Sequence, residues 1–336
     1  MKKNHVGYLS LIGLLAIALA TITKAQTTSP ALQEATKLNV QVAQLYKQNK
    51  FDEALPIAKR VVDIREKELP PNDQLLAVSH LNVAYIYRAK QKYYDAEQSF
   101  RRALKVEEKR LGKEHPELYD LYVNIGWVCH AQAKSTEAED LFKLAISTKE
   151  KQRGTEHKEV ADALVNLAAY YQKIGKPGKS LPIYQRMLTI RERAFGEISN
   201  QYKDTLEQCA CATEQNAKDI KTPEADKLWE HARYIEQQLD PSIEYAKDEV
   251  LKGTATKKVQ PEYPRVALSE RLGGRVLVKV LIDENGRVLE AKRLCGPDLL
   301  VPVSEIAASK WEFSPTVHKG NPIKVQGILT FNFTLQ

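Results

Sequence analysis

A 42-residue internal repeat constrains the fold of this chain more than any other feature of its sequence. Small side chains recur at this spacing from Ala54 to Ser180, and each unit holds two segments of helical periodicity, such as 76–90 and 95–110. The other recurring positions are Val62, Leu104, Ile146 and Leu188, then Glu66, Glu108, Glu150 and Glu192, then Gly112, Gly154 and Gly196, and the small series Val42, Ala84, Gly126 and Ala168. One helix pair leaves an apolar face uncovered, so this period predicts a solenoid of stacked pairs.

The motif between units is similar to a known repeat class. Leu111-Gly-x-x-His-Pro116 and the 42-residue period resemble tetratricopeptide repeats of the kinesin-light-chain-like variety. A weaker fifth unit follows at a spacing of 45, and Asp240-Pro241 closes it. We therefore predict a tetratricopeptide repeat domain over residues 30–240, with about five units.

The resemblance implies that the first helix of each pair lines a concave groove that binds a peptide or protein. The candidate contacts on these helices are Asn82, Tyr85, Arg88, Asn124, Trp127, His130 and Asn166. An amide both donates and accepts, so a ladder of asparagines suits the backbone of an extended peptide. The alternative is that the asparagines cap or bridge neighbouring helices within the scaffold.

A second pattern occupies the C-terminal region. β-Branched residues alternate up to Ile282 and stop before Asn285-Gly286, the preferred pair for a type I′ hairpin turn. We predict antiparallel strands over about 275–282 and 287–294. Helical spacing before Trp311 and strand chemistry over 323–335 complete a small α+β domain, in which helices cover a short antiparallel sheet.

The ordered motifs of this region resemble the C-terminal domain of TonB-type energy transducers. They are Gln260-Pro-x-Tyr-Pro264, Ile282-Asp-x-x-Gly286, Gly296, Trp311-x-Phe-x-Pro315 and Gly320-x-Pro322. The fold class is thus α + (α+β), with a tetratricopeptide solenoid, a linker over 241–258 and a TonB-like domain over 259–336. One departure is Cys295, which stands where the family has a small hydroxyl residue.

The resemblance implies binding by β-augmentation, in which an extended partner segment adds to the edge of the sheet. In the family, the partner is the N-terminal box of an outer-membrane transporter, and an inner-membrane motor supplies the force. Carried onto this sequence, the contact residues are Gln260, Pro261, Tyr263, Val325, Phe331 and Phe333. Tyr263 has a core position as its alternative, and we expect Trp311 and Phe313 in the core.

The first residues have the pattern of a secretory signal peptide. Basic residues precede an apolar run that ends near Thr23-Lys24-Ala25, which predicts cleavage after Ala25 and a periplasmic protein. Removal of residues 1–25 lowers the formal net charge from +7 to +4. The run over 6–23 is also just long enough to remain as an inner-membrane anchor.

Two departures from the family leave a second function open. His5 precedes the apolar run, where family transducers carry a histidine within the membrane helix, and repeats replace the Pro-rich spacer. The alternative is a periplasmic scaffold whose C-terminal domain only docks or forms a homodimer, without a role in transport.

The remaining chemistry of the sequence favours binding over catalysis. The sequence contains no phosphate-binding loop and no catalytic motif, so we expect a protein without enzymatic activity and without a cofactor. Cys209 and Cys211 do not face each other on a helix, and with His231 they lack a fourth metal ligand, so no metal is expected. Cys129 is expected as a buried thiol. The C-terminal basic residues lack interleaved aromatics, which argues against nucleic acid.

Overall fold

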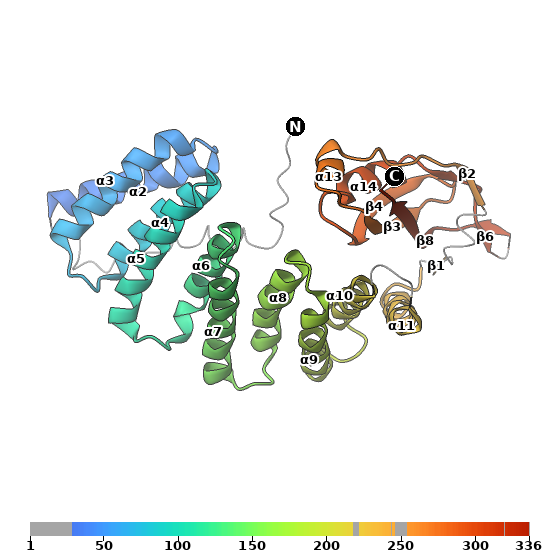
Figure 1. Cartoon of the computed structure of the whole chain (residues 1–336), viewed down its shortest axis with the longest axis horizontal. Coiled ribbons are helices and arrows are strands. Elements are labelled where there is room, and N and C mark those ends of the chain that lie inside the picture. Colours follow the sequence, from blue (N-terminus) through green and yellow to red (C-terminus); the bar gives the residue numbers. More distant parts are fainter. Residues whose placement is uncertain (1–28, 218–221, 243, 246–253, 319, 336) are drawn as a thin grey trace. The chain divides into compact units, whose positions relative to one another are not determined.

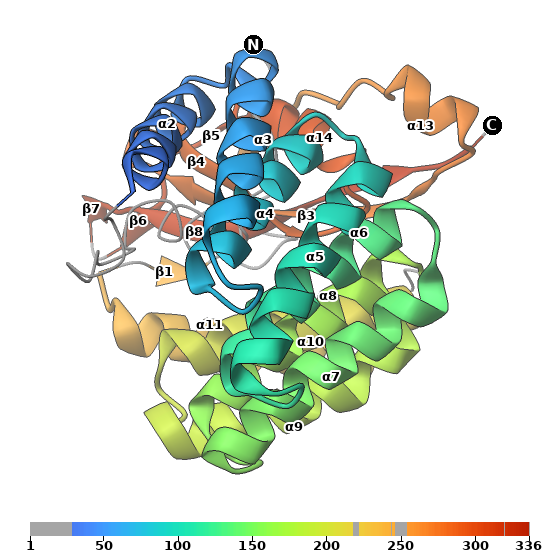
Figure 2. The ribbon, with the colours of Figure 1, turned by 90° about the vertical axis from the view of Figure 1, so that its left-hand side faces the viewer.

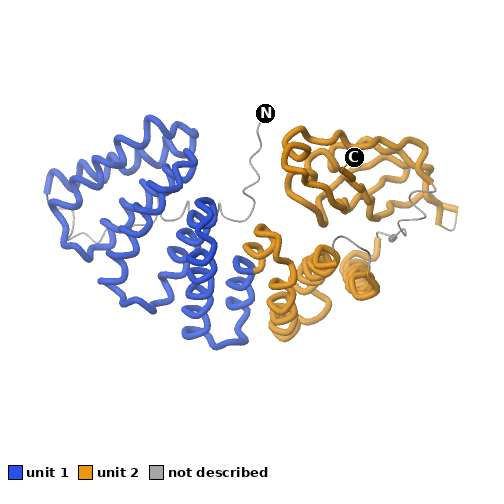
Figure 3. The backbone as a smooth tube through the Cα atoms, in the orientation of Figure 1, with its two compact units in different colours: residues 1–167 blue, residues 168–336 orange. Residues whose placement is uncertain are grey.

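The computed structural model describes residues 29–217, 222–242, 244–245, 254–318 and 320–335. Its contacts divide the chain into two compact units, residues 1–167 and residues 168–336 (Figure 3). The expected signal peptide over 1–25 and the alternative anchor over 6–23 lie outside the described residues. Within the described ranges, every helix is too short or too polar to cross a bilayer.

Helix pairs make up the described part of the first unit (Figures 1 and 2). The helices are α2 (Pro30–Lys47), α3 (Phe51–Glu68), α4 (Gln74–Ala89), α5 (Tyr93–Leu111), η1 (Pro116–Leu118), α6 (Tyr119–Ala131) and α7 (Ser135–Arg153), and α8 (Lys158–Lys173) crosses into the second unit. The pairs α2–α3, α4–α5 and α6–α7 pack along their lengths. The predicted helical solenoid is confirmed.

The 42-residue period has a structural cause at both ends of each pair. The turn within a pair places Asn49, Gln91, Ala133 and Gly175 at positive φ, again 42 residues apart. At the ends of the second helices α5, α7 and α9 (Pro177–Phe195), Gly112, Gly154 and Gly196 have φ of +90°, +85° and +80°, and their N–H groups donate to the carbonyls of Glu108, Glu150 and Glu192. A backbone of this kind is accessible almost only to glycine, which explains the recurring glycines.

Small residues allow close contact within a pair. A Cβ added to Gly126 of α6 would lie 3.0 Å from the ring of Phe142 on α7. Ala84, one period earlier, is fully buried. The expected close crossing of helices at the small-residue series is therefore present at these positions.

The second unit combines the last helices with a sheet. It contains α9 (Pro177–Phe195), α10 (Asn200–Asn216), α11 (Pro223–Leu239), β1 (Glu244–Tyr245), β2 (Ala255–Lys257), α13 (Arg265–Ser269), β3 (Gly274–Ile282), β4 (Val288–Cys295), α14 (Val301–Ala308), β5 (Glu312–Phe313), β6 (Val317–His318), β7 (Asn321–Pro322) and β8 (Val325–Phe333). The main sheet has the order β1-β8-β3-β4, in which β3 is antiparallel to both neighbours and β1 is parallel to β8. The predicted α+β domain is confirmed, with strand bounds within one residue for the first hairpin.

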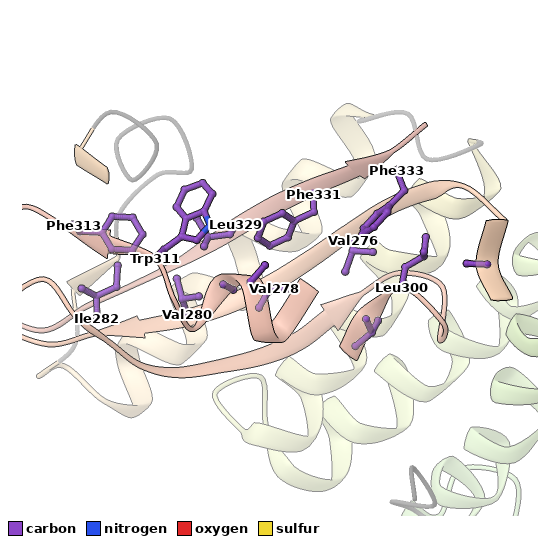
Figure 4. Packing of buried hydrophobic residues seen from close by; sticks show 14 residues of the cluster. Val276, Val278, Val280, Ile282, Leu300, Trp311, Phe313, Leu329, Phe331 and Phe333 are labelled. Carbon is purple, nitrogen blue, oxygen red and sulfur yellow. The ribbon is translucent and has the colours of Figure 1, made fainter. Parts of the chain in front are cut away.

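One face of the sheet forms the core of the C-terminal domain (Figure 4). The alternate β3 residues from Val276 to Ile282 pack with α14, Leu329 and Phe331. Trp311 lies in this core, and its Nε1 donates to the Val259 carbonyl at 2.7 Å. The expected core positions of Trp311 and Phe313 are confirmed, since both side chains are buried.

The turn between β3 and β4 differs from the predicted type I′ turn. That turn needs positive φ at both central residues, but only Gly286 of the Asn285-Gly286 pair has it, at +83°. Asp283 Oδ1 accepts hydrogen bonds from the N–H groups of Asn285 and Arg287, and the bond from Arg287 lowers the pKa of Asp283. The carboxylate thus stabilises a longer turn, and the type I′ prediction is wrong.

Candidate functional site

The three repeat asparagines lie on the first helices of successive pairs, and their amides bond to the neighbouring first helix. Asn82 Nδ2 donates to Asn39 Oδ1 of α2 at 2.7 Å. Asn124 Oδ1 on α6 accepts from Arg88 of α4 at 2.6 Å. Asn166 Oδ1 on α8 accepts from Trp127 Nε1 of α6 at 3.1 Å. These bonds correspond to the alternative in which asparagines bridge helices within the scaffold.

The Nδ2 groups of Asn124 and Asn166 also have partners within unit 1, whereas Asn82 Oδ1 is buried without one. Asn124 Nδ2 donates to the Asp120 carbonyl at 2.7 Å, and Asn166 Nδ2 donates to the Tyr119 hydroxyl at 3.0 Å. Asn82 and Asn124 are buried. A peptide that used this ladder would have to exchange existing hydrogen bonds, so peptide binding by these amides stays a prediction.

The aromatic candidates differ in how accessible they are. Tyr85 is buried, and its ring centroid lies 5.3 Å from that of Phe100. Arg88 lies over the Tyr85 ring at 5.0 Å and is half-buried. Trp127 and His130 are half-buried, with ring centroids 5.9 Å apart. Of the repeat candidates, Arg88, Trp127, His130 and Asn166 keep surface that a ligand could reach.

A buried charged cluster lies between α5 and the α6–α7 turn. Glu97 receives hydrogen bonds from Lys134 Nζ at 2.6 Å and Arg101 Nε at 2.9 Å. Burial would raise the pKa of Glu97, but these two cations outweigh it and lower that pKa. Cys129 beside them is buried, which raises its pKa to about 12, so the expected buried thiol is confirmed. The second carboxylate near Cys129 is Glu137 of α7, which pairs with Arg101, so a metal ion at these three groups would have to displace cations already in place.

The TonB-like candidates from two distant segments lie together in the C-terminal domain. The Tyr263 ring packs edge-on against Phe333 of β8, with centroids 5.2 Å apart, and its hydroxyl donates to the Leu272 carbonyl at 2.8 Å. Gln260 is exposed and Pro261 is half-buried. The structure therefore brings the Gln-Pro-x-Tyr-Pro segment beside the last strand.

Most candidate side chains on the last strand point into the core. Val325, Phe331 and Phe333 are all buried. Only their backbone groups are placed to meet a partner strand. On the outer side of β8, Val325 and Gln326 pair with β1.

A hollow of about 650 Å³ opens beside Tyr263. It is lined by Tyr263, Leu268, Arg271, Thr334 and Leu335. Leu268 and Leu335 are 47% and 46% exposed, so they present apolar surface to the solvent in the hollow. The hollow joins apolar surface to one cation at the end of β8, and the sequence patterns did not indicate it.

The second face of the sheet packs on α10 and α11, which the sequence did not predict. Residues of β3 that alternate with the core positions meet carboxylates of these helices: Arg275 lies 3.1 Å from Glu214, and Lys279 lies 2.6 Å from Glu207 and 3.0 Å from Glu236. Burial would lower the pKa of Lys279, but the two carboxylates outweigh it and raise that pKa. Lys279 is thus held as a cation.

A disulfide between Cys211 and Cys295 joins α10 to β4. Its Cα atoms are 5.5 Å apart, and it closes a sequence separation of 84 residues. Cys209 remains a buried thiol, and burial raises its pKa to about 11. Because Cys211 forms a disulfide, its sulfur is not available as a metal ligand together with Cys209 and His231. The only signal for this bond in the sequence was Cys295 itself, in place of the family's small hydroxyl residue.

We predict that Asn124→Ala lowers the free energy of unfolding by about 1–2 kcal/mol, because it removes two hydrogen bonds of a buried amide. A double-mutant cycle with Arg88→Ala, measured by urea denaturation, should give a coupling energy of at least about 0.5 kcal/mol. The exposed Asn200→Ala is the control and should change little. Near-zero change at Asn124 would instead favour a ligand-facing amide.

We also predict a large effect of Glu214→Ala, which leaves Arg275 as an unpaired, largely buried charge. The expected loss is about 3–5 kcal/mol of unfolding free energy. Glu214→Met combined with Arg275→Met should lose less, although it also removes the acceptor of the buried Trp229 Nε1–H, which donates to Glu214 at 3.0 Å. Equal losses in the single and double variants would show that the pair is not coupled. Thermal and urea unfolding of the oxidised protein measure both.

Comparisons with known proteins agree with both modules. Tetratricopeptide repeat families match residues 43–74, 74–151 and 160–201, and the family described as Gram-negative bacterial TonB protein C-terminal matches residues 259–335. The chain is similar to a solved kinesin light chain with nearly identical TPR-like repeats from Podosopora anserina, at 19% identity and a TM-score of 0.54, covering 64% of this chain and all of that one. It is also similar to BtubC (BKLC) from P. vanneervenii, at 16% identity and a TM-score of 0.50, covering 63% of this chain and 84% of that one.

At these identities, the structural likeness shows the fold alone. No curated protein matches the chain. The family matches lie on the two regions that the helix pairs and the mixed sheet occupy in the structure. The chain therefore consists of tetratricopeptide repeats that form a helical solenoid, followed by a TonB-type C-terminal domain.

Proposed function

We propose that this chain is an exported protein of the cell envelope that binds protein partners through its repeats and grips an extended segment of an outer-membrane transporter with its TonB-type domain. The observation that supports it most is the hollow at the end of β8, where the Tyr263 segment and the chain after the last strand meet. Tyr263 was a candidate contact, and Thr334 and Leu335 directly follow the candidate strand. Repeats and TonB-type domains are interaction modules, and we propose no catalytic activity.

The lining of the hollow suggests what the partner segment carries. Leu268 and Leu335 offer apolar contact for one aliphatic or aromatic side chain, and Arg271 offers a cation to a nearby carboxylate. Backbone hydrogen bonds to the sheet would supply affinity that does not depend on sequence, while the hollow would select the side chain. The proposed ligand is thus an extended, acidic segment with one apolar anchor.

The disulfide supports the proposed export. Structural disulfides persist in oxidising compartments such as the periplasm and are rare in the cytosol. The Cys211–Cys295 bond joins buried parts of the second unit and closes a long loop. The bond is consistent with the leader pattern of residues 1–25. The same proposal includes the alternative that residues 6–23 anchor the protein in the inner membrane, next to a motor.

A second function is favoured by β1. This strand pairs with Val325 and Gln326 on the outer side of β8, so part of the edge that a partner strand would use is held by the chain itself. A periplasmic scaffold whose TonB-type domain docks or dimerises, without transport, fits that arrangement. The two functions differ in what contacts the hollow.

The contact is tested with a photo-crosslinking residue, benzoylphenylalanine, at Leu268 and separately at Leu335 in the native envelope. We expect cross-links to the periplasmic N-terminal segment of an outer-membrane transporter, identified by mass spectrometry. The same residue at Val317, which is 58% exposed in β6, is the matched control and should not capture it. Cross-links to a second copy of this chain, or to soluble proteins alone, would contradict a role in transport and favour the function as a periplasmic scaffold.

Export is tested by the N-terminus and membrane partition of the protein in its native cells. A mature start at Gln26 in the periplasmic fraction is the expected result and would assign the protein as an adaptor that is not anchored. An intact N-terminus in the inner membrane would make direct coupling to a motor the function. A cytosolic protein with four alkylatable thiols would contradict export.

A further inference from the structure

We propose that the Cys211–Cys295 disulfide carries mechanical tension between the last helix pair and the TonB-type domain. Tension then passes through this bond and not through the linker over 241–258. The biological setting of this inference rests on the proposed function, in which a partner pulls on the domain. The bond itself is a property of the chain alone. Nothing in the repeat or TonB-type sequence patterns requires it.

The bond lies where two structural layers meet. Cys211 is on α10, and Cys295 is the last residue of β4. Cys295 is 4% exposed and packs in a cluster with Ala210, Trp229 and Leu277. The covalent connection is therefore enclosed by the same apolar contact that joins α10 and α11 to the sheet.

Polar contacts flank the disulfide along β3. Arg275, Leu277 and Lys279 alternate on the strand and so share the face toward α10 and α11. Glu214 binds Arg275, and Glu236 binds both Lys279 and the Gln326 side chain of β8. The strands that carry load are thus each attached to α10 or α11, with the single covalent bond at the end of β4.

Force reaches this bond by a short route. A pull on β8 passes to β3 through an antiparallel register that extends from Gly274–Phe333 to Ile282–Val325. Along the backbone, the same pull passes from β8 back to Cys295 and then through the sulfur–sulfur bond to α10. Hydrogen bonds and ion pairs rearrange under sustained load, whereas the covalent bond does not. The backbone of the linker over 241–258 therefore carries no tension while the bond is intact, and β3, which lies inside the closed loop, is loaded only through its hydrogen bonds to β8.

Stretching single molecules tests the proposal directly. Purified full-length protein is held by handles at its two ends in an optical trap and pulled to full extension. The oxidised protein should end about 300 Å shorter than the Cys211→Ala/Cys295→Ala variant, because the closed loop hides 84 residues at about 3.5 Å each. Cys129→Ala/Cys209→Ala, which alters the two free thiols, is the control and should match the unmodified protein.

The order of events decides whether the bond bears load. Without the disulfide, we expect a new release step at lower force than any unfolding step, as the intact domain separates from α10 and α11. The same step should appear when a trialkylphosphine reductant is washed over oxidised molecules, which covers the case of a variant that folds poorly. Equal final lengths would show that the bond does not form.

Unchanged first-rupture forces in the variant and after reduction would show that packing and ion pairs carry the load alone. Either of these two results overturns the proposal. The stretching measurement uses no transporter, so the absence of a cross-link at Leu268 would not change its result. Conversely, a result against the disulfide would leave the proposal on partner binding untouched.

Discussion

The contact between the second face of the β-sheet and helices α10 and α11 determines how the C-terminal half of this molecule is built. A repeat solenoid ends with a helix pair whose outer apolar face has no further pair to cover it. Here Leu277, Leu294 and Ile328 of the sheet cover Ala210, Ala225 and Trp229 of the last pair. In return, the helices cover a sheet face that would otherwise expose apolar side chains to water.

The compact units do not follow the sequence domains. The division falls between Leu167 and Ala168, within α8, and the unit that holds the sheet also holds α10 and α11, which pack on it. Two charged residues of β3 make the contact between the sheet and the helices more specific. Arg275 and Lys279 occupy strand positions where apolar residues would have packed, and each finds a carboxylate on a helix. A misaligned domain would leave these charges buried without partners, which is costly, so the ion pairs favour one register.

The parts of the fold that repeat were predictable, and the parts that depend on single long-range pairs were not. The 42-residue series predicted the helix pairs, and positive φ recurs at Gly154 and its equivalents Gly112 and Gly196. The alternation of residues along β3 predicted both the bounds of this strand and the face that packs in the core. The disulfide escaped prediction because its cysteines are far apart in sequence and connectivity cannot be read from spacing. The hairpin turn escaped because a side chain, Asp283, outweighed the local preference of Asn285-Gly286.

The closed loop also changes what cleavage of the chain would do. A protease that cut any exposed bond between α10 and β4 would leave the two fragments tied through Cys211 and Cys295, with the sheet still seated on the helices. Loss of the domain by a single cut is then confined to sites beyond Cys295 or before Cys211. The part of the chain around the linker over 241–258 is in this sense expendable as a covalent connection.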